Sequence, residues 1–285
     1  MAVLFSTVSG KGGVGKTLLT ASLGITLSKK KKKVLLIDCD MGLRNMDLPL
    51  GLENDCFYNI RDLAQGLCMP EDVILPVKSG LDFLPATASG SWEDVVPAAI
   101  ETVLEDAASL YDYIFLDCPA GMGKGIDFAA RVSDKMLIVT SSSWASKRNA
   151  EHLFSAYRRK VSCLFIFNQF SLRDPTRIPF AEMADTVDED YFGGVVPYSS
   201  QIDEYAHHGL LTSFDGKTAF GESLDCISRI LLEEKQFPES KWKRILNKAD
   251  TEEEVYHSGK TEKKVIHQGL TWSSGSPAYH RRWRR

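Results

Sequence analysis

Three kinds of feature are missing from this 285-residue sequence, and each absence excludes a class of protein. No stretch reaches the ~18 apolar residues that a membrane-spanning helix needs. The six cysteines form no Cys-x-x-Cys pair, so their spacing signals neither a zinc site nor an iron–sulfur cluster. The first residues form an apolar, strand-like run instead of a secretory signal. We therefore expect a cytoplasmic protein with reduced, mostly buried thiols.

Basic charge is scarce over most of the chain. Residues 1–232 carry 22 Lys and Arg against 30 Asp and Glu, whereas residues 233–285 carry 12 against 8. Non-specific DNA binding needs a basic face that releases counterions from the duplex, so DNA is an unlikely partner. Five lysines at 29–33 end a predicted helix, where cations complement the helix dipole. We interpret them as a solvated helix end and keep a nucleic-acid contact as the less favoured alternative.

What the sequence does contain is a phosphate-binding loop. Residues 9–17 read Ser-Gly-Lys-Gly-Gly-Val-Gly-Lys-Thr, between a strand-like run at 3–8 and a helix-like run at 18–28. In this P-loop spacing, backbone N–H groups surround the phosphates, Lys16 reaches the terminal ones and the Thr17 hydroxyl binds magnesium. A glycine-rich surface turn is the alternative, which the flanking elements disfavour. The predicted nucleotide-binding residues here are Gly10, Lys11, Gly12, Gly13, Val14, Gly15, Lys16, Thr17 and Leu18.

A second lysine, Lys11, lies inside the loop. It has no structural task there because it competes with Lys16 for the same phosphates, and a solvated side chain is the alternative. Lys-Gly-Gly-Val-Gly-Lys-Thr resembles the deviant Walker A motif of the ParA/MinD ATPases. The resemblance implies that Lys11 reaches the other subunit's phosphates in a nucleotide-sandwich homodimer, as an arginine finger does. It also implies catalytic roles for Lys11 and Lys16, with ATP and Mg²⁺ as cofactors.

The segment from 34 to 53 is more selective within that family. Its apolar start, Val-Leu-Leu-Ile, predicts a buried parallel strand that delivers Asp38 and Asp40 to its C-terminal end. Two turn-forming aspartates are the alternative. The segment closely resembles the one that distinguishes the MinD-type septum site-determining ATPases from their chromosome-partitioning relatives. By that resemblance Asp40 positions the attacking water, and Asp38 belongs to the same switch and approaches magnesium through water.

A third strand repeats the pattern at 113–121. It resembles the family's Walker B motif and second switch, which implies that Asp117 reaches magnesium through water and that Gly121 gives backbone freedom near the γ-phosphate. By the same resemblance Asn168 contacts adenine and Pro197 borders the base. Both follow apolar strands, and plain turn chemistry is an equally favoured interpretation of these two residues.

Strands that alternate with helical segments predict one doubly wound α/β domain over residues 1–232, a mostly parallel sheet flanked by helices. The resemblance places this domain among the P-loop NTPases of the deviant Walker A class. Patterning also predicts a strand at 81–86, a helix at 92–110, a strand at 135–140, a helix to 157 and a last core helix at 217–232.

Residues 233–249 are predicted to form a linker and a short basic amphipathic helix with an interfacial tryptophan. MinD proteins carry their membrane-targeting helix at this place, so the resemblance implies peripheral binding to the anionic inner face of the cell membrane. The alternative is a helix that packs its apolar stripe on the protein's own core. The residues expected to contact lipid are Trp242, Ile245, Leu246, Lys243 and Arg244.

Two departures from the family are visible. Residues 250–285 extend beyond its usual end, are polar, and are predicted to be disordered. Their basic cluster at 280–285 is interpreted as a second lipid or nucleic-acid contact or as a solubilising end. The segment 140–144, Thr-Ser-Ser-Ser-Trp, lacks the Pro-Glu that MinD proteins commonly carry after this strand.

The resemblance implies an ATPase that dimerises around ATP, cycles on and off the inner membrane face, and positions the division site with an activator and a division-inhibitor protein. A ParA-type chromosome or cargo positioning ATPase is one alternative, and it would need DNA stimulation. A slow nucleotide-gated scaffold is another, because a P-loop alone does not prove turnover. The lack of suitably arranged cysteines counts against the metal-carrier and nitrogenase-reductase relatives.

Overall fold

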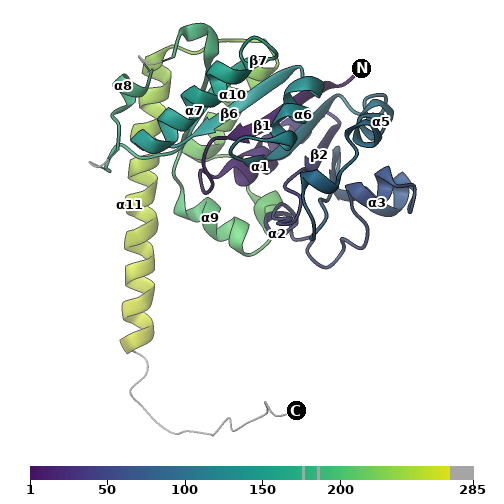
Figure 1. Cartoon of the computed structure of the whole chain (residues 1–285). Coiled ribbons are helices and arrows are strands. Elements are labelled where there is room, and N and C mark those ends of the chain that lie inside the picture. The colour runs from purple at the N-terminus through teal and green to yellow at the C-terminus, as the bar shows by residue number, and fades with distance from the viewer. Residues whose placement is uncertain (175–176, 185–186, 270–285) are drawn as a thin grey trace, which may run out of the picture.

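The computed structural model describes residues 1–174, 177–184 and 187–269 of the chain. Its strands are β1 (Val3–Ser9), β2 (Val34–Asp38), β3 (Leu75–Lys78), β4 (Leu81–Leu84), β5 (Tyr113–Ala120), β6 (Lys135–Thr140), β7 (Ser162–Phe170) and β8 (Phe192–Pro197). They form one sheet in the order β3-β4-β2-β5-β1-β6-β7-β8 (Figure 1). Every pair is parallel except β3 with β4. The predicted doubly wound, mostly parallel sheet is confirmed.

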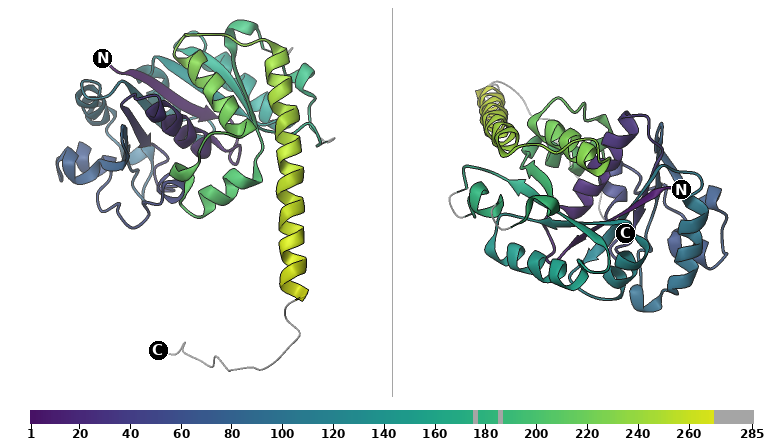
Figure 2. Two further views of the ribbon diagram at one scale, coloured as in Figure 1. Left: turned by 180° about the vertical axis from the view of Figure 1, so that it is seen from behind. Right: turned by 90° about the horizontal axis from the view of Figure 1, so that it is seen from above.

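Helices cover both faces of the sheet. They are α1 (Lys16–Lys29), α2 (Asp47–Leu50), α3 (Ile60–Ala64), α4 (Pro70–Val73), α5 (Pro97–Ala107), α6 (Lys124–Val132), α7 (Trp144–Tyr157), α8 (Phe180–Ala184), α9 (Ser200–His207), α10 (Ala219–Leu231) and α11 (Glu239–Gly269), with 3-10 turns at Trp92–Asp94, Glu189–Tyr191 and Leu211–Ser213. Helices α1 and α10 pack together on one face, and α6 and α7 lie on the other (Figure 2).

The central strands are buried on both faces because helices cover both. All five residues of β2 are buried, as are the last five of β1, which explains their continuous apolar runs. In the register of β2 with β5, Asp38 lies beside Asp117. The carboxyl ends of β1, β2 and β5 therefore meet at one edge of the sheet, where α/β proteins bind ligands. Four of the six cysteines are buried, as expected.

One predicted helix is wrong in its extent. The pattern at 92–110 suggested a continuous amphipathic helix, but the structure has a 3-10 turn at Trp92–Asp94 and then α5 from Pro97 to Ala107. Proline lacks the N–H that a helix interior requires and clashes with the preceding turn, whereas it is favoured at the first helical position. Pro97 therefore starts the helix instead of lying within it.

The lysines at 29–33 end α1, as predicted. Lys29 is the last residue of the helix, and its ammonium donates to the Phe214 carbonyl and lies 5.4 Å from that ring centroid. Lys30 pairs with Asp225 at 2.6 Å. The first two lysines of the run therefore have partners within the protein.

The amphipathic stretch in the C-terminal region packs on the protein's own core. Trp242, Ile245 and Leu246 are 1%, 0% and 1% exposed, because α10 and β8 cover the stripe. The Trp242 ring lies 5.7 Å from that of Phe192 and 6.1 Å from that of Phe237, centroid to centroid. The prediction that Trp242, Ile245 and Leu246 contact lipid is wrong for this fold, since the core already removes these side chains from water.

The basic residues predicted to accompany that stripe point outward and pair with carboxylates. Lys243 pairs with Glu239 at 2.8 Å within α11, and Arg244 pairs with Glu222 of α10 at 3.0 Å. Glu222 also pairs with Lys241 and with Lys248. The ion pairs of Glu222 thus hold α11 to α10. The lipid contact of Lys243 and Arg244 was predicted beside an inserted apolar stripe, and that stripe is buried in the core.

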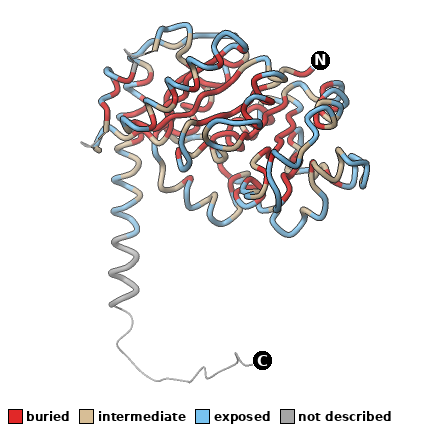
Figure 3. Tube along the Cα trace, in the orientation of Figure 1, coloured by how far each residue is buried: buried red, intermediate tan, exposed pale blue. Residues whose placement is uncertain are grey.

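Helix α11 does not end at 249. It continues to Gly269 and projects from the body of the protein, with burial decreasing along it (Figures 1 and 3). Residues 250–269 are therefore helical, and the prediction that they are disordered is wrong. An ion pair one turn apart, Lys248 with Glu252, supports the helix, and His257 Nε2 lies 3.4 Å from Glu253 in the next turn. The basic cluster at 280–285 lies outside the described residues.

Within the described ranges, none of the helices combines the length and the apolar composition that crossing a bilayer requires.

Candidate nucleotide-binding site

The loop between β1 and α1 has the backbone that a phosphate cradle requires. Gly13 and Gly15 adopt φ angles of 78° and 77°, the left-handed region that favours glycine. Gly15 is the N-cap of α1, and no described side chain caps this helix, so its first N–H groups can face an anion. Gly10 is required for another reason, since a Cβ there would lie 2.6 Å from the Cβ of Asn149.

Lys16, Thr17 and Asp117 form a buried polar cluster at the carboxyl end of the sheet. The Lys16 ammonium lies 2.9 Å from Asp117 Oδ1, and the Thr17 hydroxyl donates to Oδ2 at 2.5 Å. Burial alone would lower the pKa of Lys16, but the Asp117 carboxylate beside it raises that pKa above its usual value. Lys16 is therefore charged, and Asp117 holds it at the mouth of the loop.

Asp38 organises the loop that follows β2. Its Oδ1 accepts the Asp40 N–H at 2.9 Å, and its Oδ2 accepts the N–H groups of Asn45 and Met46 at 3.1 and 3.2 Å. Burial, together with the nearby Asp117 carboxylate, raises the pKa of Asp38 to about 7. Asp38 is thus a positioning residue for the loop that carries Asp40. Its water-mediated approach to magnesium stays a prediction.

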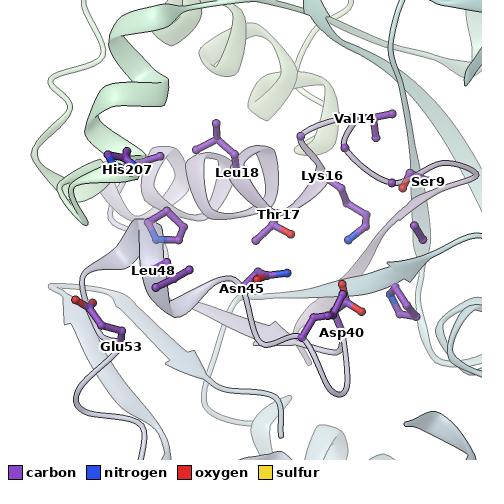
Figure 4. Close-up of a pocket in the computed structure, with 18 of the residues that line it drawn as sticks. Ser9, Val14, Lys16, Thr17, Leu18, Asp40, Asn45, Leu48, Glu53 and His207 are labelled. Atoms are coloured by element: carbon purple, nitrogen blue, oxygen red, sulfur yellow. The ribbon is translucent and has the colours of Figure 1, made fainter. Parts of the chain in front are cut away.

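Asp40 faces the P-loop across a cavity of about 900 Å³ (Figure 4). Its carboxylate points toward Lys16, with Thr17 and Asn45 nearby (Figure 4). Burial raises the pKa of Asp40, and the positive charge of Lys16 partly opposes that shift. A half-buried carboxylate with a raised pKa, aimed at the phosphate end of a cavity, is suited to orient a water and accept its proton.

Lys11 and Gly121 adjoin the cavity-lining residues Gly12 and Ala120 in sequence, and neither lines the cavity itself. Lys11 is exposed and does not line the cavity; its carbonyl accepts the Ser9 hydroxyl at 3.0 Å. Gly121 has a φ of 96°, and its N–H donates to the Ser9 carbonyl at 2.8 Å, which ties the second switch to the P-loop. The exposed ammonium of Lys11 is free to reach outward, so its action on another subunit stays a prediction.

The residues predicted to bind the base lie together but enclose little space. Asn168 is buried, and its Nδ2 donates to the carbonyls of Val14 and Gly15 at 2.8 and 3.3 Å. Pro197 ends β8 beside it, and the space between them, next to Leu18, measures only about 10 Å³. In this structure Asn168 braces the P-loop, and adenine contact by Asn168 and Pro197 stays a prediction.

Donors at the P-loop fit magnesium better than a transition metal. Thr17 and Asp117 offer hard oxygen ligands, and among residues 1–174, 177–184 and 187–269 no group of three or more His, Cys, Asp or Glu side chains is arranged to hold a metal ion. Magnesium usually keeps several waters and binds one or two protein oxygens plus substrate phosphates. The residues present therefore fit a magnesium ion that arrives with a nucleotide.

Sequence reasoning missed the far wall of the cavity. There α2 and the end of α9 approach closely, since a Cβ on Gly51 would lie 2.6 Å from the Gly209 carbonyl oxygen. A histidine pair at the end of α9 belongs to no motif, so its place could not be found from spacing. The cavity-lining residues that were not predicted include Leu43, Asn45, Leu48, Glu53, His207 and His208.

Known nucleotide-binding proteins are similar to this chain in sequence. Residues 5–212 match the sequence profile of the CobQ/CobB/MinD/ParA nucleotide binding domain. The septum site-determining protein MinD of Thermotoga maritima is 30% identical over 242 residues, covering 80% of this chain and 88% of that protein.

Solved structures are similar over the same region. A chain of the MinC:MinD cell division protein complex of Aquifex aeolicus has a TM-score of 0.71 at 31% identity, covering 83% of this chain and 98% of that one. The MinD structure from Pyrococcus horikoshii, complexed with Mg-ADP, has a TM-score of 0.72 at 26% identity, covering 81% and 96%.

Proposed function

Because the chain belongs to the CobQ/CobB/MinD/ParA nucleotide-binding family, we propose that it is a magnesium-dependent ATPase of the MinD type that positions the cell-division site. The observation that carries this proposal is the cluster of Lys16, Thr17 and Asp117 at the P-loop, with Asp40 facing it across the cavity. The role in placing the division site is supported by relatives that are named septum site-determining protein MinD.

Each polar residue at the phosphate end of the cavity has a separate role in the proposed reaction. Incoming phosphates replace Asp117 as the partner of Lys16, which is long enough to turn from one to the other. Thr17, with Asp117 acting through water, would hold the magnesium ion, which would neutralise phosphate charge. Asp40 orients a water toward the terminal phosphate and accepts its proton, and Asp38 keeps Asp40 in place through the loop N–H groups.

The proposal includes a homodimer joined by ATP. Lys11 is exposed and precedes the cavity-lining Gly12, so its cation can reach the phosphates held by a facing subunit. The Aquifex aeolicus relative is described as a complex of MinC with MinD, so we propose a division inhibitor of that kind as a partner, together with an activator of hydrolysis.

We also propose that the protein is cytoplasmic and associates peripherally with the inner face of the cell membrane. Trp242, Ile245 and Leu246 are not available to lipid in this fold. Any lipid contact must therefore come from other residues.

Nucleotide binding and turnover test the proposal. Wild type should bind ATP in calorimetry and release phosphate, whereas Lys16→Ala should bind no nucleotide, because no other lysine or arginine of the described residues lines the cavity. Tight ATP binding by Lys16→Ala would refute the P-loop assignment. ATP binding by wild type with no phosphate release, even with liposomes or DNA present, would favour the nucleotide-gated scaffold.

A further inference from the structure

Three consecutive glutamates on α11 each contact a different element of the body. Glu252 accepts the Ala219 N–H at 2.9 and 3.2 Å, at the first residue of α10. Glu253 accepts both the N–H and the hydroxyl of Ser200, at 2.8 and 2.7 Å, at the first residue of α9. Glu254 pairs with Arg173, in the segment after β7, at 2.5 Å. We call these three residues the acidic clamp.

Two of these contacts are of a strong kind. A carboxylate at a helix N-terminus satisfies an unpaired N–H and faces the positive end of the helix dipole. Hydrogen bonds to an ionised acceptor are roughly twice as strong as neutral ones. Glu253 is only 19% exposed, so water competes poorly for it. The clamp therefore ties the first residues of α9 and α10 to α11.

Helices α9 and α10, which Glu253 and Glu252 hold, border the place predicted to receive the base. The small space there is lined by Asn168 and Gln169 from β7, by Phe220 from α10, and by Pro197 with the residues that start α9. Its volume of about 10 Å³ is at most that of a single water. The phosphate end opens into about 900 Å³. Phosphates can therefore enter this structure, but a purine ring cannot pass between Asn168 and Pro197.

We propose that the acidic clamp holds the base subsite closed, so that Glu252 and Glu253 are positioning residues that set how readily the base end of a nucleotide is admitted. This rests on the proposed function, since it requires a nucleotide whose phosphates occupy the P-loop. To admit the base, the first turn of α9 or α10 moves outward, and the contacts of Glu253 with Ser200 or of Glu252 with Ala219 lengthen.

Loosening the clamp should strengthen binding of the base end of a nucleotide and leave the affinity for phosphates alone unchanged. When only a fraction of the molecules is open, the apparent affinity for ATP is the intrinsic affinity multiplied by that fraction. A substitution that raises the open fraction therefore raises the apparent affinity in proportion. Glu253→Gln keeps the side-chain shape and removes the charge. We expect it to bind ATP about threefold to tenfold more tightly and to associate faster, while inorganic tripolyphosphate binds as it does to wild type.

The experiment measures binding of ATP and of tripolyphosphate by calorimetry, and of ATP by stopped-flow, with the full chain. Glu239→Gln is the matched control, because Glu239 lies on the same helix and, among the described residues, forms its ion pair with Lys243 of that helix. Ser200→Ala, which deletes the hydroxyl hydrogen bond to Glu253 and keeps the one from the Ser200 N–H, should shift ATP affinity in the same direction by less. Thermal melts of each variant check that the fold persists.

The outcomes separate the clamp from the proposed function. Equal ATP affinity for wild type and Glu253→Gln, both folded, would overturn the clamp, as would a parallel change for ATP and tripolyphosphate. Weaker ATP binding by both Glu253→Gln and Ser200→Ala would overturn it as well. Wild type that binds neither ligand would instead refute the P-loop assignment, and the clamp with it.

Discussion

Ile245 lies at the centre of the stripe that α11 buries against β8 and α10, and its side chain is fully inaccessible to water. Replacing it with alanine removes three buried carbon atoms and leaves a cavity. Such substitutions cost about 2 to 5 kcal/mol in other cores. For a protein of this size 1 kcal/mol shifts the melting temperature by roughly 2 to 4 °C, so Ile245→Ala should melt about 4 to 20 °C below wild type.

Lys243→Ala is the matched control on the same helix. Lys243 is 52% exposed and pairs with Glu239 one turn away, so its loss should change stability by no more than about 0.5 kcal/mol. Thermal and urea unfolding of the two variants would be compared with wild type. Co-sedimentation with anionic vesicles would run in parallel.

If Ile245→Ala melts together with wild type, the side chain does not stabilise the core. If Ile245→Ala keeps the wild-type melt and also loses vesicle binding, the stripe contacts the membrane instead. A destabilised Ile245→Ala beside an unaffected Lys243→Ala would establish that the stripe belongs to the core.

Three further substitutions test the site. Lys11→Ala should keep ATP affinity within about 0.5 kcal/mol because Lys11 does not line the cavity, yet lose the dimer in light scattering; a variant that dimerises with ATP as wild type does would contradict its role. Asp40→Ala should slow phosphate release about 10²- to 10⁴-fold and accumulate the ATP-bound dimer, and unchanged turnover would exclude Asp40 as the base. Asp38 has its pKa raised to about 7 from 3.8, so the folded state holds its proton more tightly and this contribution to stability falls as pH rises through that window. Urea unfolding at about pH 5 and pH 8 should show a smaller difference for Asp38→Asn than for wild type, and an equal difference would assign the pH dependence to other groups.

Local motifs made the phosphate end predictable. A P-loop is contiguous in sequence, and two neighbouring parallel strands that carry Asp38 and Asp117 towards their carboxyl ends deliver them to the same edge of a sheet. The bracing of the P-loop by Asn168 was not visible, because a strand-terminal asparagine has many possible partners. Which oxygen of Asp38 serves which N–H depends on the path of a loop that no pattern fixes.

The C-terminal region was mispredicted for a physical reason. An amphipathic stripe shows that one side of a helix avoids water, but not whether lipid or protein covers it. In the structure, Trp242 packs on a protein surface formed by β8 and α10, which lie earlier in the chain. Similarly, the run Glu252–Glu254 has the polar composition of a disordered tail, and its ordering depends on helix N-termini that lie 33 and 53 residues away. Such contacts become visible only in three dimensions.

The late position of α11 in the chain has a consequence for synthesis. The groove on β8 and α10 is complete once Leu231 has been made, but its cover ends at Ala249, 18 residues later. At about 5 to 20 residues per second, translation leaves this apolar groove open for roughly 1 to 4 s. A nascent chain stalled in that interval would expose apolar surface at Phe192. We therefore expect the protein to depend on chaperones most at the step where α11 emerges.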